Sequence, residues 1–278
     1  MFHMVFGKSV PDISTDAVAN LGYADVRFEA TVYPGDTVRA HTTVLGRRRS
    51  ARGDTGVVGP HIRLQPAQRG SAAFIRWVLM NKRDPSTATG VDDAPNSSRW
   101  TPRRSTCPLS STAGLLLERY RRPRVVGPRP ASASTVEGVA IEEAKPDGGP
   151  TLPEHGAGAP GAYALQGTRF GKRVIYGGHI ISMARALGYN GLENAVRVLA
   201  FNGGTHSNPT FAGDTVFAWT DVIERIDLGR PDAGALRLRL VGVKNHDPHT
   251  EETSLRVADE QGAGATTSTW SSISITRS

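Results

Sequence analysis

The residues best suited to chemistry lie in the second half of the chain, where Gly177, Gly178 and His179 precede an apolar run. Glycine lets the backbone approach a ligand closely, and the first N–H groups of a helix favour negative charge. A helix that begins here would offer backbone donors to an oxyanion. His206 follows in a Gly-rich stretch, and imidazoles exchange protons near neutral pH. These four residues are the candidate catalytic residues.

A purely structural explanation of the same residues stays open. Glycines at a helix start also permit close packing on a sheet, and histidines there are commonly packing or hydrogen-bonding residues. Neither His179 nor His206 has a second ligand at regular spacing, so we expect no metal site. Cys107 is the single cysteine, which excludes an intrachain disulfide and a multi-cysteine metal centre.

The elements that would position these residues are a short helix followed by long strands. An apolar stripe at helical spacing runs through residues 180–187, which predicts a helix buried on one side. Apolar residues alternate with polar ones or form short runs over 196–201, 215–226 and 235–243, which predicts strands. This order suits a sheet curled around one helix.

The tetrapeptide Gly-Asp-Thr-Val occurs twice, at 35–38 and 213–216. Each copy lies between two strand-like runs, and each follows an apolar helix candidate, which is 2–10 in the first half. Asp36 and Asp214 follow turn glycines, so we expect them to hydrogen-bond to their own backbone. We interpret the match as an internal repeat of one fold.

The first copy of the repeat has weaker signals. Strands are expected over 24–32, 38–45 and 74–80, with a helix or loop over 12–20. Residues 59–73 have the length of a strand without its alternation. Because almost no sequence precedes the apolar helix, we expect this N-terminal unit to be truncated.

The run Phe-Gly-x-x-Val-Ile-Tyr-Gly-Gly-His-Ile-Ile-Ser at 170–182, with Phe-Ala-Gly-Asp-Thr-Val at 211–216, resembles the MaoC-like hydratases of the hotdog fold. Asn-Gly-Gly-Thr-His-Ser-Asn-Pro at 202–209 is similar to their two-repeat branch, the mesaconyl-CoA hydratases or β-methylmalyl-CoA dehydratases. The resemblance implies an α+β double hotdog, in which antiparallel sheets wrap central helices. It also implies an acyl-CoA thioester substrate, mesaconyl-CoA first, and no cofactor beyond that CoA.

Hydration of an enoyl-CoA needs an acid–base pair that activates water and protonates the α-carbon. It also needs N–H donors on the thioester oxygen, which the resemblance assigns to Gly177 and Gly178. The family's acid–base motif should fall in 144–169. That range offers Asp147, Glu154 and His155 without the family's spacing, and His155 is better explained as an exposed loop residue. We therefore expect impaired turnover, and the assignment as an enzyme stays open.

We expect an incomplete N-terminal unit at 1–85, an irregular Arg-, Pro- and Ser-rich linker at 86–135, and a C-terminal unit at 136–278. A long structureless segment belongs between units. Residues 145–165 and 245–278 also lose periodicity. Together with 59–73, these stretches have the composition of GC-rich coding DNA read out of frame, a hypothesis that translation of the other frames would test.

The net charge of +7 is concentrated in residues 97–130, which hold eight of the 33 basic residues and one of the 26 acidic ones. Only Trp100 and Tyr120 are aromatic there, so nucleic-acid binding ranks last among the functions considered. No apolar run reaches the length of a membrane helix, and the N-terminus lacks signal-peptide order. We expect a cytoplasmic protein with neither nucleic-acid nor membrane partners.

A non-catalytic hotdog protein that binds acyl-CoA, or only dimerises, is the alternative function, and the missing acid–base motif favours it. Thioesterases of the same fold would need a carboxylate near the helix, and none is well placed. We expect a homodimer because a hotdog sheet has an exposed edge that requires pairing. The two units could pair with each other or with a second chain.

Overall fold

The structure is a computed structural model. It describes residues 2–14, 17–28, 32–50, 55–66, 72–87, 133–134, 138–141, 170–172, 174–189, 192, 195–229, 233–248 and 266–277. The expected linker at 86–135 therefore lies almost wholly outside the described residues, as does the range 145–165.

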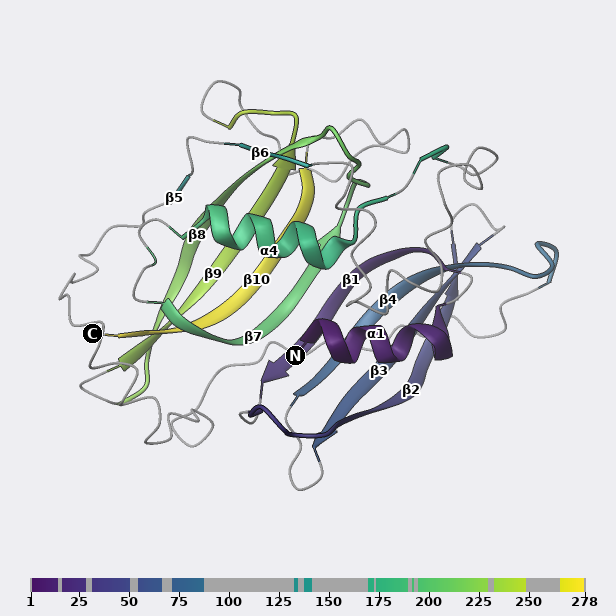
Figure 1. Ribbon diagram of the computed structural model, residues 1–278, viewed down its shortest axis with the longest axis horizontal. Coiled ribbons are helices and arrows are strands. Elements are labelled where there is room, and N and C mark those ends of the chain that lie inside the picture. Colours follow the sequence, from purple (N-terminus) through teal and green to yellow (C-terminus); the bar gives the residue numbers. More distant parts are fainter. Residues whose placement is uncertain are drawn as a thin grey trace.

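The described part of the first half forms one helix and four long strands. The helix α1 comes first and lies against the strands, as its apolar sequence predicts (Figure 1). The elements are α1 (Phe2–Ile13), β1 (Ala17–Phe28), β2 (Val38–Arg49), β3 (Thr55–Pro66) and β4 (Ala72–Asn81).

The second half repeats this arrangement with a helix and four long strands. Two short strands, β5 (Ala133–Ser134) and β6 (Val139–Ala140), pair with the edge strand β8. The principal elements are α4 (Gly177–Leu187), β7 (Ala195–His206), β8 (Thr215–Asp227), β9 (Ala233–Lys244) and β10 (Thr266–Arg277).

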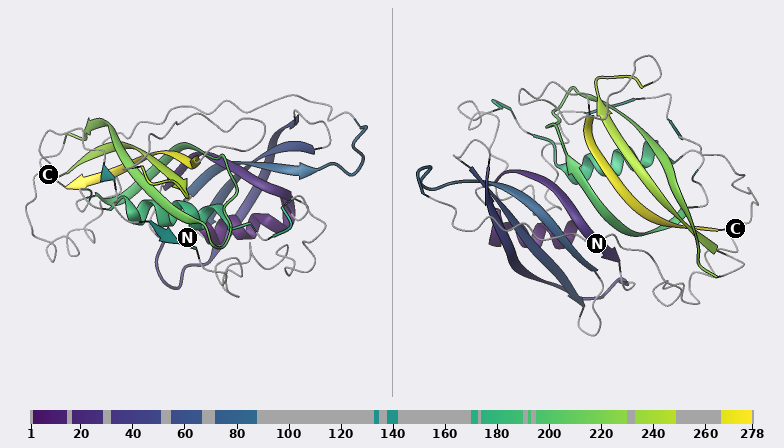
Figure 2. Two further views of the ribbon diagram at one scale, coloured as in Figure 1. Left: turned by 90° about the horizontal axis from the view of Figure 1, so that it is seen from above. Right: turned by 180° about the vertical axis from the view of Figure 1, so that it is seen from behind.

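All these strands belong to one sheet in the order β2-β3-β4-β1-β7-β10-β9-β8-β5, with β6 on β8. Every pairing is antiparallel. The two halves join where β1 pairs with β7, and both helices lie on the same side of the sheet (Figure 2). The structure is the expected α+β double hotdog, and its two units pair with each other.

The two copies of Gly-Asp-Thr-Val form matching turns. Gly35 and Gly213 have φ angles of +94° and +89°, a region that favours glycine. The backbone N–H of Tyr33 donates to Asp36 Oδ2 at 2.8 Å, and that of Phe211 donates to Asp214 Oδ2 at 2.9 Å. These bonds confirm the expected role of both aspartates, and they support the internal repeat.

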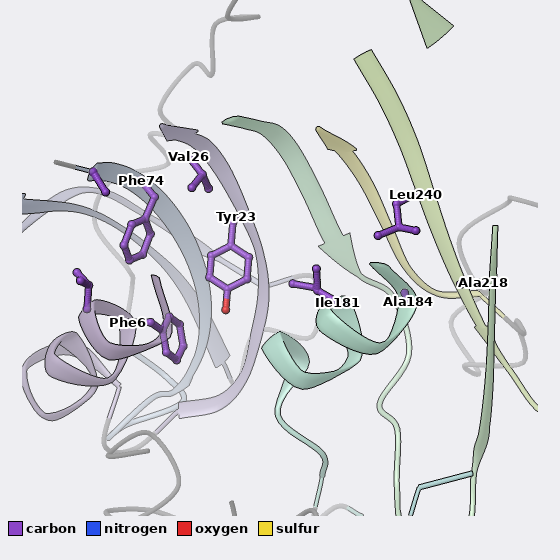
Figure 3. Packing of buried hydrophobic residues seen from close by; sticks show 10 residues of the cluster. Phe6, Tyr23, Val26, Phe74, Ile181, Ala184, Ala218 and Leu240 are labelled. Carbon is purple, nitrogen blue, oxygen red and sulfur yellow. The ribbon is translucent and has the colours of Figure 1, made fainter. Parts of the chain in front are cut away.

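One hydrophobic cluster spans both units. Phe6 and Tyr23 from the first unit belong to the same buried cluster as Ile181, Ala184 and Leu240 from the second (Figure 3). Figure 3 shows α4 beside β1, with Ile181 toward the side of Tyr23. The two units therefore share a core, and the space between α1 and α4 is enclosed by residues from both.

The expected helix or loop at 12–20 was wrong in part, and two further strands had no clear pattern in the sequence. The strand β1 begins at Ala17 because residues 17–20 pair with Met80, Leu79 and Val78 of β4. Residues 59–66 belong to β3 although their sequence does not alternate. The Ser- and Thr-rich residues 266–277 form β10, which lies between β7 and β9. In these cases long-range pairing overrides a weak local pattern.

Candidate active site

The helix α4 begins directly after Tyr176, and no side chain caps its start. The first N–H groups of an α-helix lack partners inside the helix, so this end presents donors and the positive end of the helix dipole. The segment before it is held in place by Ile175, whose N–H donates to Thr210 O at 2.8 Å. An anionic oxygen would be stabilised at this position.

Gly177 is in contact with the imidazole of His206. A Cβ added to Gly177 would stand 2.5 Å from Cε1 and 2.9 Å from Cδ2 of that ring, which real Cβ contacts do not show. His206 is the last residue of β7, which extends beyond the strand expected at 196–201 and includes the Gly-rich stretch. Its ring also lies edge-on to Tyr23, with centroids 6.1 Å apart. Burial lowers the pKa of His206 to about 4, so the imidazole is neutral at pH 7.

Gly178 is covered by a second histidine, His3 of α1. A Cβ added to Gly178 would stand 2.6 Å from His3 Cε1. His3 Nδ1 and the Tyr176 hydroxyl form a hydrogen bond of 3.0 Å, and their rings meet edge-on. The first unit thus contributes a titratable side chain to the start of the helix of the second.

A cavity of about 470 Å³ lies between the two units, beside His3. Both helices and the joining strands β1 and β7 contribute to its wall. Its lining is mainly apolar or aromatic: Phe2, His3, Tyr23, Val26, Ile181, Ser182, Arg185, Ala186, Tyr189 and Phe201. A cavity of this size and character suits a small organic group.

The structure brings three of the four predicted site residues together, because His206 lies on Gly177 and Gly178 follows it in the chain. His179 lies in the first turn of α4 and does not line the cavity. His155 lies outside the described residues, as does almost all of 144–169, where the acid–base motif was expected.

Sequence reasoning missed His3 and Tyr176. The candidate histidines that the sequence offers, His155, His179 and His206, all lie in the second half of the chain. The internal repeat was the signal that could have indicated these two residues, because two copies of the fold place two central helices near each other. The arrangement that results combines helix N–H donors, a neutral imidazole and a His–Tyr hydrogen bond beside an apolar cavity.

Within the described ranges, no group of three or more His, Cys, Asp or Glu side chains is placed to hold a metal ion. No helix among the described residues is both long and apolar enough to cross a membrane.

The sequence is similar to two characterised enzymes over most of its length. It is 41% identical to a β-methylmalyl-CoA dehydratase from Chloroflexus aurantiacus over 263 residues, which are 90% of this chain and 73% of that protein. It is 39% identical to a mesaconyl-CoA hydratase from Cereibacter sphaeroides over 252 residues, which are 88% and 72% respectively. No protein-family model matches the chain.

The fold is similar to those of solved structures. A MaoC-domain dehydratase from Chloroflexus aurantiacus superposes with a TM-score of 0.84 at 36% identity, over 99% of this chain and 80% of that one. A Mycobacterium tuberculosis protein with a double hotdog fold superposes with a TM-score of 0.72 at 20% identity, over 100% and 80%. The chain belongs to the MaoC-like hydratases of the hotdog fold, in the branch of β-methylmalyl-CoA dehydratase and mesaconyl-CoA hydratase.

Proposed function

We propose that this protein catalyses the reversible hydration of a short enoyl-CoA thioester, mesaconyl-CoA to β-methylmalyl-CoA. The observation that carries the proposal is the uncapped start of α4 at Gly177 and Gly178, beside an apolar cavity between the units. The sequence identity of 41% to a β-methylmalyl-CoA dehydratase supports the choice of substrate.

In this proposal the thioester oxygen binds at the start of α4, where the helix N–H groups stabilise the negative charge of the enolate. The acyl group occupies the cavity. Water adds its oxygen to the β-carbon and loses a proton, and the α-carbon gains a proton. The π bond of the C=C unit breaks while one C–O and one C–H bond form, and the addition of water is redox-neutral overall. CoA is part of the substrate, so the proposed reaction requires no further cofactor.

The acid–base step is the part of the reaction that the residues of this site support least. An imidazole whose pKa is lowered to about 4 is a poor base at pH 7, so His206 does not replace the family's motif. The loss of a general acid or base costs about 10²–10⁴-fold in rate. We therefore propose a hydratase whose turnover is reduced to this extent.

The test is a hydration assay of this chain with mesaconyl-CoA and crotonyl-CoA, beside the Chloroflexus aurantiacus dehydratase. We expect detectable product from mesaconyl-CoA at a rate roughly 10²–10⁴-fold below that of the relative. Failure to exceed the uncatalysed rate would overturn the proposed activity. It would favour the second candidate, a non-catalytic acyl-CoA-binding protein, which the missing acid–base motif supports.

We also propose that the protein is a homodimer. The strand β2 lies at one edge of the sheet and leaves Val44 and Leu45 exposed at 50% and 40%. Apolar side chains on an unpaired edge favour association with another chain. Sedimentation velocity at rising concentration tests this, and a single monomeric species throughout would contradict it.

A further inference from the structure

Arg185 carries the charge in the wall of the cavity between the units. It lies on α4 and is partly buried, and it lines the cavity beside Ser182 and Tyr189. Among the described residues, no Asp, Glu or Lys lines the same cavity. Burial lowers the pKa of Arg185, which the neighbouring Tyr189 partly offsets. A guanidinium in mainly apolar surroundings is costly unless an anion or hydrogen-bond acceptors satisfy it.

The two buried arginines in the described part of the chain have such partners there, whereas the partly buried Arg185 has none. Arg237 donates to Glu224 Oε2 at 2.7 Å, and Arg76 donates to Ser9 O at 3.2 Å and to Ser14 Oγ at 2.9 Å. Among the described residues, Arg185 has neither an ion pair nor a hydrogen bond. Its donors are therefore available to a ligand in the cavity.

Arg185 lies on the same face of α4 as Gly178, and this face lines the cavity. Arg185 follows Gly178 by seven residues, which is two helical turns or about 10.5 Å along one face of α4. Helical side chains tilt toward the N-terminus, so the guanidinium lies nearer to the helix start than its Cα does. The hydroxyl of Ser182, one turn earlier, donates to Gly178 O at 2.9 Å, which leaves Arg185 as the stronger donor to a ligand.

We propose that Arg185 binds the free carboxylate of the acyl group and so selects carboxylated acyl-CoA thioesters. The inference rests on the proposed function, because it places the thioester at the start of α4. A mesaconyl group carries its free carboxylate at the end opposite the thioester. The planar guanidinium binds a carboxylate through two parallel hydrogen bonds, and the low polarity of the wall strengthens them.

The competing explanation is that the stem of Arg185 covers apolar surface while its guanidinium reaches water. In that case the charge contributes nothing to the choice of acyl group. The two explanations differ in a binding measurement that does not require turnover.

The experiment compares succinyl-CoA with butyryl-CoA by isothermal titration calorimetry. Both acyl groups have four carbons and neither has a double bond to hydrate, so they differ in the terminal carboxylate. We expect the wild-type protein to bind succinyl-CoA roughly 10- to 100-fold more tightly, as expected for charged hydrogen bonds. Arg185→Met should abolish this preference, and Arg185→Lys should retain part of it.

Arg225→Met is the matched control, because Arg225 is exposed on β8 and does not line the cavity. It removes one positive charge and should weaken both CoA ligands equally. Arg185→Gln replaces the guanidinium with a polar but uncharged amide. It serves as a second variant where Arg185→Met lowers the melting temperature.

Equal affinity of the wild type for the two ligands overturns the proposal, as does undetectable binding of both. A preference that survives in both Arg185→Met and Arg185→Gln also overturns it. A preference that depends on Arg185, in a protein that fails to hydrate mesaconyl-CoA, supports the proposal and refutes only the hydratase activity.

Discussion

The imidazole of His206 lies directly on the backbone of Gly177, so the end of β7 is in contact with the start of α4. No side chain larger than hydrogen fits between them. The close packing that the structural explanation of this glycine requires is therefore present in the structure. The same contact makes the two residues depend on each other.

Gly177→Ala should destabilise the protein by about 1–3 kcal/mol, because the added methyl group overlaps the His206 ring. His206→Ala removes the obstacle, so the double variant should be less destabilised than the sum of the two single variants by at least ~1 kcal/mol. Urea denaturation measures all four proteins. Gly203→Ala is the control, since its nearest neighbour would be Tyr23 O at 3.9 Å. Additive effects would contradict the contact.

The burial of His206 should make the protein less stable in mild acid. Its pKa is lowered from 6.5 to about 4 because the charged imidazole is desolvated. Between these values the unfolded chain binds a proton that the folded chain does not, so stability falls as pH drops from about 6.5 to 4. The full effect is about 3 kcal/mol.

Denaturation at a series of pH values tests this expectation. His206→Gln should flatten the dependence on pH between 4 and 6.5, where the wild type loses stability. His41→Gln, at an exposed site on β2, should leave it unchanged. An equal slope in His206→Gln and in the wild type would assign the effect to other groups.

The pairing of β1 with β7, which joins the two units, depends on Gly22. It pairs with Thr205 across the β1–β7 ladder, and a Cβ there would collide with the carbonyl oxygen of Gly204. Because that oxygen is a backbone atom, it cannot move away by a change of rotamer, as a side chain can. Gly22→Ala should therefore push β1 and β7 apart and weaken the coupling of the units.

Calorimetry should show this as a lower melting temperature for Gly22→Ala, with a broadened or divided transition. Gly203→Ala, on the facing strand of the same ladder, has room for its methyl group and should behave as wild type. A sharp transition at the wild-type temperature in Gly22→Ala would show that the ladder does not limit stability.

The second unit was predictable because its signals are local and agree with one another. The apolar stripe through 180–187 marks α4, and three strands followed from alternation. The strand β10 was not predictable in this way. Its Ser- and Thr-rich sequence gives little periodicity, and its place between β7 and β9 depends on pairing along both edges.

The candidate site was predictable only in the part that lies on one helix. Gly177 and Gly178 are adjacent in the sequence, and their role follows from the physics of a helix start. His3 is separated from Tyr176 by 173 positions, and no local pattern connects them. The place of Arg185 in the cavity wall was equally hidden, since periodicity does not show which side of a helix faces a cavity.

The contribution of Arg76 to stability cannot be read from the alternation of apolar and polar residues along β4. It lies on the core side of β4 with an exposed fraction of 1%, and its guanidinium lies 4.6 Å from the centre of the Phe6 ring. Burial lowers its pKa to about 10.

The desolvation of a buried charge offsets much of what its hydrogen bonds contribute, so Arg76→Met should change the free energy of unfolding by less than about 1 kcal/mol. Arg76→Ala leaves a cavity and should cost at least ~2 kcal/mol more. Equal losses in the two variants, measured by urea denaturation, would show that the charge itself stabilises the first unit.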